Sequence, residues 1–260
     1  MGRWALVMLA AAVGACDARS LVTDGGTGTG GTTGPDCDLC MDGLLSDFED
    51  LAAATIVRTG SPPRNGFWYE YNDMSPSCAQ LPTLGAGSYV GAAPPLQAPG
   101  TTGSLALRAT WVDCSTWGAG IGADLNVPLS PAGGIYSGPK VPYDLTPYTG
   151  VMFWAMAMPG SDVQLRIKFP MTDETAIVDG GNCNDTSTNK CSDNWGEAFS
   201  LPTNGNWKQV TVRFNDPSFQ QEGWGAPFPW NPQHVTSLQI QGRDKTEQYD
   251  FWIDDVALIH

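Results

Sequence analysis

The chain ends in a strand-like segment, residues 249–259, that reads Tyr-Asp-Phe-Trp-Ile-Asp-Asp-Val-Ala-Leu-Ile. Successive residues of a strand point to opposite faces. Strict alternation would therefore give two faces, one with Phe251, Ile253, Asp255, Ala257 and Ile259 and the other with Trp252, Asp254, Val256 and Leu258. Both faces are mostly apolar, so we expect a buried strand in which one of the aspartates meets an apolar layer.

A second acidic cluster, Asp47-Phe48-Glu49-Asp50, lies near the start of the region that has the composition of a folded domain. A buried carboxylate needs a partner or a metal, because leaving it unpaired costs free energy. Carboxylate oxygens are the ligands that Ca²⁺ prefers. Two acidic clusters that bracket one domain therefore predict a structural Ca²⁺ between its first and last strands.

Between these clusters the sequence is a series of short segments with alternating apolar residues, separated by Gly, Pro and Asn. The segments expected to form strands are 66–71, 104–111, 118–127, 151–157, 163–169, 207–214 and 235–241. The strict alternation in 163–169 leaves one face of that strand in water. A short helical turn is expected near 143–148. Short strands at such spacing predict an all-β fold, a β-sandwich of the jelly-roll type.

The N-terminus has the pattern of an export signal. Arg3 precedes a short apolar stretch, 4–15, and Val13-Gly14-Ala15-Cys16 resembles the lipobox of bacterial lipoproteins. The resemblance implies a signal peptide over 1–15 and lipidation of Cys16, while an ordinary secreted protein is the alternative. The Gly/Thr-rich stretch that follows, within 16–40, predicts a flexible tether.

We expect one folded domain over 41–260, because no second linker of this kind follows. The net charge of −14 disfavours nucleic acid and anionic membrane surfaces as partners and suits cations and uncharged ligands. The lipid anchor is the expected contact with the membrane. The predicted location is the cell envelope, at the outer membrane or cell surface rather than the inner membrane, although Asp17 favours inner-membrane retention under enterobacterial rules.

Six cysteines remain besides Cys16, which in an exported protein predicts three disulfides with 15 possible connectivities. The spacing favours Cys183–Cys191 and Cys78–Cys114, which leaves Cys37–Cys40. The Cys37-x-x-Cys40 motif could also be a redox or zinc motif. Zinc is disfavoured because there is neither a second such motif nor a nearby histidine.

Several short motifs together resemble the galactose-binding-like β-jelly-roll carbohydrate-binding modules, family 11 most closely. They are the residues 47–50, Gly-Phe-Trp-Tyr at 66–69, Tyr-Asp-Leu-Thr-Pro-Tyr-Thr-Gly-Val at 143–151, Phe-Trp-Ala at 153–155, Asn-Trp-Lys-Gln-Val at 206–210 and Phe-Trp-Ile-Asp-Asp-Val at 251–256. The resemblance implies that Glu49 and Asp254 are the side-chain ligands of the Ca²⁺. A long segment over 173–194 and a long loop between Asn72 and Leu105 depart from that family, which puts its usual β-glucan preference in doubt.

Carbohydrate sites pair flat aromatic rings with polar hydrogen-bonding side chains. We expect the ligand to be bound by aromatic residues in loops or beside polar pairs, rather than by aromatics with apolar neighbours on strands. The candidate ligand-binding residues are Trp68, Tyr71, Asp73, Trp117, Asp193, Trp195 and Trp224.

The sequence therefore predicts non-catalytic binding of a polysaccharide by a membrane-anchored, exported lipoprotein. One alternative is a surface adhesion or structural protein that binds a protein partner. A jelly-roll glycanase is the other, since a carboxylate pair can act on glycosidic bonds. We expect no enzyme, because the sequence has only two histidines and no G-x-S-x-G or H-E-x-x-H motif.

Overall fold

The computed structural model describes residues 43–49, 60, 63–82, 92–101, 103–127, 141–244 and 247–260. The predicted signal peptide, the lipidated Cys16, the tether and the Cys37–Cys40 pair lie outside the described residues. No helix among the described residues has the length and apolarity to cross a membrane.

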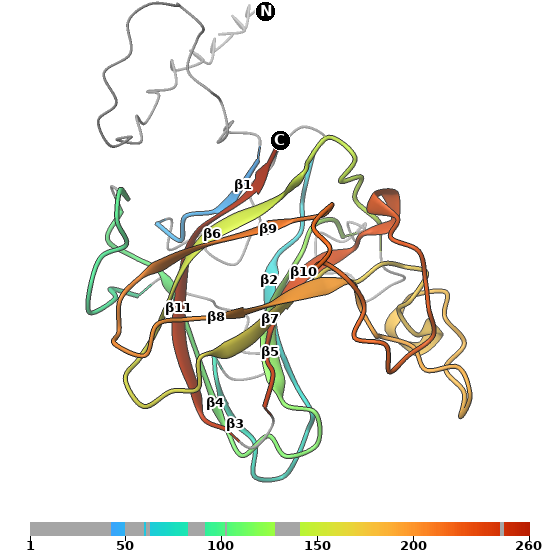
Figure 1. Ribbon diagram of the computed structural model, residues 1–260, viewed down its shortest axis with the longest axis horizontal. Helices are drawn as coiled ribbons and strands as arrows, with labels where there is room; N and C mark the ends of the chain where they lie inside the picture. The colour runs from blue at the N-terminus through green and yellow to red at the C-terminus, as the bar shows by residue number, and fades with distance from the viewer. Residues whose placement is uncertain are drawn as a thin grey trace, which may run out of the picture. The chain divides into compact units, whose positions relative to one another are not determined.

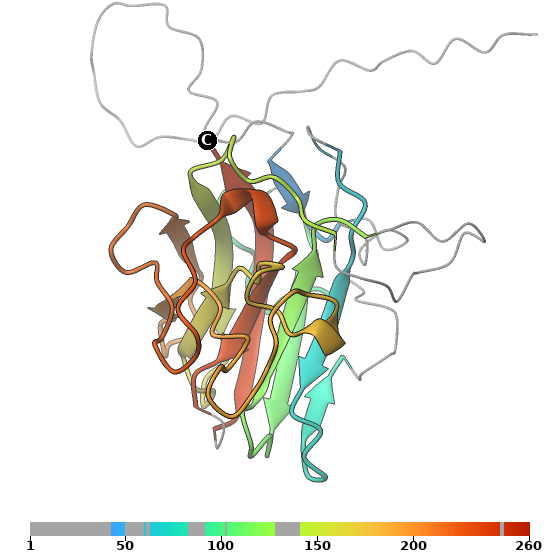
Figure 2. The same cartoon turned by 90° about the vertical axis from the view of Figure 1, so that its right-hand side faces the viewer.

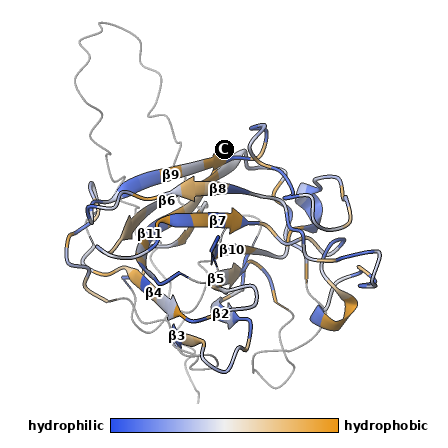
Figure 3. Cartoon of the chain, turned by 60° about the horizontal axis from the view of Figure 1, so that its bottom comes forward, coloured by the Kyte–Doolittle hydropathy of each residue, from blue (hydrophilic) through white to orange (hydrophobic). Residues whose placement is uncertain are grey.

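The described strands form two antiparallel sheets (Figure 1). The first sheet has the order β3 (Ala79–Leu81), β4 (Leu107–Val112), β11 (Tyr249–Ile259), β6 (Gly150–Ala157) and β9 (Lys208–Arg213), with β1 (Leu44–Ser46) also paired to β11. The second has the order β2 (Trp68–Asn72), β5 (Ala119–Asp124), β10 (Ser237–Gly242), β7 (Gln164–Lys168) and β8 (Gly196–Ser200). The strand orders of both sheets can be followed by their labels in Figure 3. Figure 2 shows β5 in green beside β2 in cyan. This arrangement confirms the predicted all-β jelly-roll sandwich.

The core lies between the sheets and is built by alternate residues of each strand. Ile121, Ile167 and Ile240 face inward from the second sheet, and Phe153 and Phe251 from the first; all five are fully buried. Their neighbours along each strand point outward, because the side-chain period of a strand is two. The inward set therefore also fixes which side chains the second sheet presents on its outer face.

The last strand departs from strict alternation. The pairing of β11 with β6 shifts register between Asp254 and Ala257, and Asp255 has a φ of 47°. A bulge of this kind moves all later residues to the other face. Tyr249, Phe251 and Ile253 are consequently followed in the main core by Val256 and Leu258. The prediction that Ala257 and Ile259 share the face of Phe251 is wrong, because the sequence carries no glycine or other signal that reveals the bulge.

Two of the expected disulfides are present among the described residues. Cys78 pairs with Cys114, and Cys183 pairs with Cys191. The helical turn expected near 143–148 is instead a turn without helix, in which Asp144 Oδ1 accepts the backbone N–H of Thr146. The helical segments of the described chain are two 3₁₀ turns, η1 (Ile177–Asp179) and η2 (Pro232–His234).

Candidate functional site

Two cross-strand rows of side chains cover the outer face of the second sheet. One row consists of Tyr69, Gly122, Gln239 and Lys168, and the next consists of Tyr71, Gly120, Gln241 and Arg166. Both rows alternate with the buried isoleucines of the core, so they point away from the first sheet. This face therefore presents phenol rings, amides and cations side by side.

The glycines of β5 allow both tyrosine rings to lie across the sheet. A Cβ added to Gly122 would meet Tyr69 Cζ at 2.6 Å, and one added to Gly120 would meet Tyr71 Cζ at 2.5 Å. Any larger residue would force the rings away, since packed interiors do not tolerate such overlap. Gln239 Nε2 donates to the Tyr69 hydroxyl at 2.8 Å and holds that ring in place. We call Tyr69 and Tyr71, whose rings are tilted by 45° to each other, the tyrosine floor.

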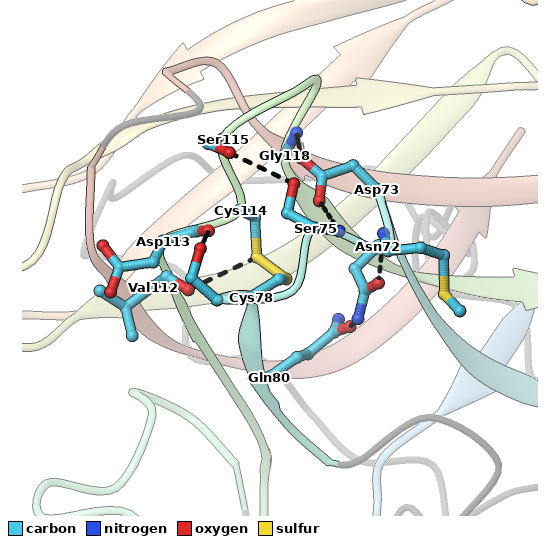
Figure 4. The surroundings of a disulfide bond; sticks show 12 residues. Asn72, Asp73, Ser75, Cys78, Gln80, Val112, Asp113, Cys114, Ser115 and Gly118 are labelled. Carbon is cyan, nitrogen blue, oxygen red and sulfur yellow. Dashed lines mark hydrogen bonds between the residues drawn. A yellow bond between two sulfur atoms is a disulfide. The ribbon is translucent and has the colours of Figure 1, made fainter.

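A loop over 113–118 carries Trp117 next to the floor. Asp73 Oδ2 accepts the backbone N–H groups of Thr116, Trp117 and Gly118 at 2.6, 3.1 and 3.1 Å, and the Cys78–Cys114 disulfide lies beside this contact (Figure 4). Burial raises the pKa of Asp73, but the opposing hydrogen bonds, including one from Ser75, hold it well below its usual value. Trp117 is 47% exposed and stacks on Tyr71, with ring centroids 6.0 Å apart.

A second loop, 222–225, carries Trp224 and is also held by an aspartate carboxylate. The Asp193 carboxylate accepts the backbone N–H groups of Glu222, Gly223 and Gly225 at 2.9, 2.8 and 3.0 Å. Asp193 follows Cys191, whose disulfide to Cys183 closes the preceding loop. Trp224 is 56% exposed, so its ring is available to a ligand.

A cleft with a volume of about 230 Å³ has Trp117 and Trp224 among its lining residues. Its polar lining includes Arg166, Lys168, Asn194, Glu222, Gln241 and Arg243. Lys168 Nζ donates to Gln241 Oε1 and lies 5.4 Å from the centroid of the Tyr71 ring. Burial and the nearby Arg166 lower the pKa of Lys168 to about 8. The cleft thus joins the tyrosine floor to a group of amides and cations.

The structure brings Tyr71, Trp117 and Trp224, three of the predicted ligand-binding residues, to this face of the second sheet. The prediction for Trp68 is wrong: only 2% of it is exposed, and its ring packs against Phe48 in the core. Trp68 lies three residues from Tyr71 on one strand, so the two must face opposite sides.

Trp195 is half-buried and does not line the cleft, so its role as a ligand-binding residue stays a prediction. Its ring packs against Phe219 and Trp230, and its Nε1 donates to the Phe228 carbonyl at 2.7 Å. Asp73 and Asp193 do lie beside the site, but backbone amides already occupy their carboxylates. They position the two loops, and direct bonding of these carboxylates to the ligand stays a prediction.

The sequence reasoning missed the residues of the sheet itself. Tyr69, Gln239, Gln241, Arg166 and Lys168 occupy the outer face, yet the search concentrated on loops. The signal was present, because strict alternation in 163–169 already predicted a solvent-facing side on which Arg166 and Lys168 lie.

The predicted metal ligands lie at the other sheet. Asp254 is 3% exposed, and its Oδ1 accepts the N–H of Asp255 at 2.8 Å. Burial, then Asp255, Glu49 and Asp47, raise the pKa of Asp254 to about 8. Glu49 Oε1 accepts the Leu105 N–H at 2.8 Å. Asp254 has no paired lysine or arginine among the described residues, and hard oxygen donors of this kind suit Ca²⁺, but three of these carboxylates do not converge within 4.8 Å.

A second group of potential ligand atoms can be set aside. Asp73, Cys78 and Cys114 have ligating atoms within 4.8 Å of one another, the one such group of three or more acidic, cysteine or histidine residues in the described ranges. Both sulfurs belong to one disulfide, so neither can act as a thiolate ligand. This group is a structural part of the 113–118 loop.

Neither a family model nor a curated protein sequence matches the chain. Among solved structures, the chain is similar to the family 11 carbohydrate-binding module from Clostridium thermocellum in complex with a β-1,3-1,4-mixed-linked tetrasaccharide, with 10% identity, 84% of this chain and 94% of that chain covered, and a TM-score of 0.44. It is also similar to the family 30 module of a Clostridium thermocellum cellulosomal cellulase, with 13% identity, coverage of 74% and 90%, and a TM-score of 0.42. An exo-β-agarase structure is similar as well, with 10% identity, 83% of this chain and 25% of that chain covered, and a TM-score of 0.43. Likenesses at these scores say nothing about what this chain binds.

We predict that Asp193→Ala releases the 222–225 loop. Three part-buried backbone amides lose their acceptor, which should destabilise the folded state by about 1–3 kcal/mol. Hydrogen exchange of the Glu222, Gly223 and Gly225 amides should accelerate relative to the strands. Asp216→Ala is the matched control, since Asp216 is exposed and accepts only within its own turn, from Ser218. Unchanged exchange at these three amides would show that Asp193 does not hold the loop.

Proposed function

We propose that the chain is a non-catalytic polysaccharide-binding protein that uses the cleft and the tyrosine floor. The carrying observation is the floor itself, two rings packed over glycines with Trp117 stacked against one of them. The C–H faces of sugars pack on such rings, and sugar hydroxyls bond to amide and charged side chains at their rim. Arg166, Lys168 and Arg243 line the cleft with such charged groups, next to the amides of Gln241 and Asn194.

The carboxylates of the cleft support binding rather than catalysis. A glycosidase needs one carboxyl group as general acid and a second as base or nucleophile. Asp193 is occupied by three amides, and Glu222 lies 3.3 Å from Arg243. Neither is placed to exchange a proton with a glycosidic oxygen. We therefore assign the cleft to recognition.

Trp117→Ala and Trp224→Ala should each lower the affinity for the polysaccharide ligand by about tenfold or more, because each removes an exposed stacking surface. Affinity electrophoresis over a broad glycan panel, followed by calorimetry on the best ligand, measures this effect. Leu96→Ala is the control, since Leu96 is 51% exposed and its carbonyl, which accepts from Trp207, stays in place. No reducing sugar should be released. Absence of binding to the whole panel would contradict the proposal.

We propose that the domain is held at the cell envelope by a lipid on Cys16. The supporting features are the apolar stretch before Val13-Gly14-Ala15-Cys16 and the Gly/Thr-rich sequence that follows. A multiply acylated cysteine anchors stably, whereas a single chain binds a membrane only reversibly.

The wild-type protein expressed in a bacterial host should therefore partition with membranes and incorporate labelled fatty acid. Cys16→Ser should lose both properties. Cys37→Ser is the control for a general effect of thiol loss. Incorporation of label by the Cys16→Ser variant would rule out this anchor.

We also propose that Glu49 and Asp254 hold a structural Ca²⁺. The ion would offset the repulsion among Asp254, Asp255, Glu49 and Asp47 next to the last strand. It would join the segment after β1 to β11, the strand that pairs with β1, β4 and β6. Its role would be to stabilise the fold, because it lies at the first sheet and not at the cleft.

Ca²⁺ should raise the melting temperature of chelator-treated protein, with about 2.7 kcal/mol of stabilisation when its concentration is 100 times the dissociation constant. In Asp254→Asn the response to Ca²⁺ should disappear, because one charged ligand is lost. Asp179→Asn, at an exposed position of η1, should keep the wild-type response. Equal melting curves with and without Ca²⁺ in verified metal-free protein would remove the calcium proposal.

A further inference from the structure

The cleft is rich in positive charge although the chain is strongly acidic. Arg166, Lys168 and Arg243 line it together with two carboxylates, Asp193 and Glu222, whereas the whole chain has a net charge of −14. Arg166 and Lys168 are adjacent on the outer face of β7, at the level of Gln241 and Gln239. Neighbouring cations repel each other, so this placement needs a compensating charge.

No carboxylate of the described residues compensates Arg166 or Lys168 directly. Arg166 Nη2 donates to two backbone carbonyls, of Asn194 at 3.3 Å and Gln220 at 2.5 Å. Lys168 donates to the amide oxygen of Gln241. Neither takes part in any ion pair within 4.0 Å in the described part of the chain.

The acidic groups nearby are already engaged. Asp193 serves three backbone amides, and Glu222 pairs with Arg243 at 3.3 Å. Glu174 is fully buried, and burial raises its pKa to about 8, so it is mostly protonated at neutral pH. Glu222 and Asp193 therefore act on Arg166, and Glu222 acts on Lys168, through space, without forming an ion pair within 4.0 Å among the described residues.

The site also has unused hydrogen-bonding atoms. Asn194 lines the cleft and is 7% exposed, and its buried Oδ1 has no partner. The buried hydroxyl of Tyr71 has none either. An unsatisfied buried polar atom costs free energy. The Asn194 side chain thus lies beside a pair of cations that form no ion pair among the described residues.

We propose that the cleft selects an acidic glycan, one that carries carboxylate or sulfate groups, and places an anionic group against Lys168 and Arg166. The inference rests on the proposed polysaccharide binding and names its ligand class. Charge-assisted hydrogen bonds are roughly twice as strong as neutral ones, so the anionic group provides selectivity over neutral sugars with the same ring faces.

Matched polymers test this selectivity on the wild-type protein. The first pair is polygalacturonate and its full methyl ester, and the second is a sulfated galactan and its desulfated form. At least one acidic polymer should bind about tenfold or more tightly than its neutral partner. Its affinity should fall as salt is added, since screening weakens exposed charge interactions. The pair that shows the preference identifies carboxylate or sulfate as the recognised group.

Three variants test whether the positive charge of Lys168 causes the preference for acidic polymers. Lys168→Gln should reduce the acidic-to-neutral preference by about tenfold, and Lys168→Arg should retain most of it, because it keeps the charge. Lys208→Gln removes one charge from exposed β9 of the other sheet and should leave the preference unchanged. Circular dichroism and melting curves confirm that each variant is folded.

The outcomes separate this inference from the proposed function. Binding of neutral glycans that equals or exceeds binding of acidic ones overturns the acidic preference and leaves polysaccharide binding intact. A preference that survives Lys168→Gln, or that disappears in Lys208→Gln, overturns the assignment to Lys168. Failure to bind any of the polymers or any member of the glycan panel overturns both.

Discussion

The two glycines of β5 beneath the tyrosine rings are the constraint on which the binding face depends. Gly120 and Gly122 leave room for Tyr71 and Tyr69 to lie across the sheet, and any Cβ there would overlap the ring atoms. The antiparallel register then places Gln239, Gln241, Lys168 and Arg166 in line with the rings. An aromatic surface with polar groups along one side follows from this single cross-strand arrangement. The inward isoleucines of the same strands keep the register fixed, since a shift by one residue would bury the polar set.

The two loops that carry tryptophan, 113–118 and 222–225, are held by the same type of interaction. In each, an aspartate carboxylate accepts three successive or nearly successive backbone amides, and a disulfide lies within a few residues. Loops ordered before binding lose less conformational entropy when a ligand arrives. Trp117 and Trp224 are therefore held as rigid platforms beside the tyrosine floor. The long segments that depart from the family 11 pattern supply much of this second loop support, through Cys183, Cys191 and Asp193.

The sequence predicted the sandwich well because its strands alternate cleanly. The last strand, 249–259, is found with its predicted bounds, and the strands over 151–157 and 163–169 are found within a residue or so. The short strands β1, β3 and β8 escaped prediction, since three to five residues give too little pattern to separate a strand from a loop. The bulge at Asp255 escaped as well, because a positive φ at an aspartate has no local signature here.

Prediction of the site was less complete, for physical reasons that differ between residues. Trp68 could have been excluded by alternation alone, since it cannot share a face with Tyr71. The positioning roles of Asp73 and Asp193 depend on amides far along the chain, near Trp117 and Trp224, so no local pattern reveals them. The absence of an ion pair to Lys168 or Arg166 among the described residues is a property of the folded arrangement, and overall charge pointed toward neutral ligands and cations instead.

The most direct test of ligand binding at this face is an NMR titration of the indole N–H signals with the best-binding oligosaccharide. Binding at the cleft predicts that the signals of Trp117 and Trp224 shift with a common saturation curve. The signals of the core residue Trp68 and of Trp252, on the first sheet, should stay in place. Shifts confined to Trp154, Trp207 and Trp252, with none at Trp117 or Trp224, would contradict the account by moving the ligand to the opposite sheet.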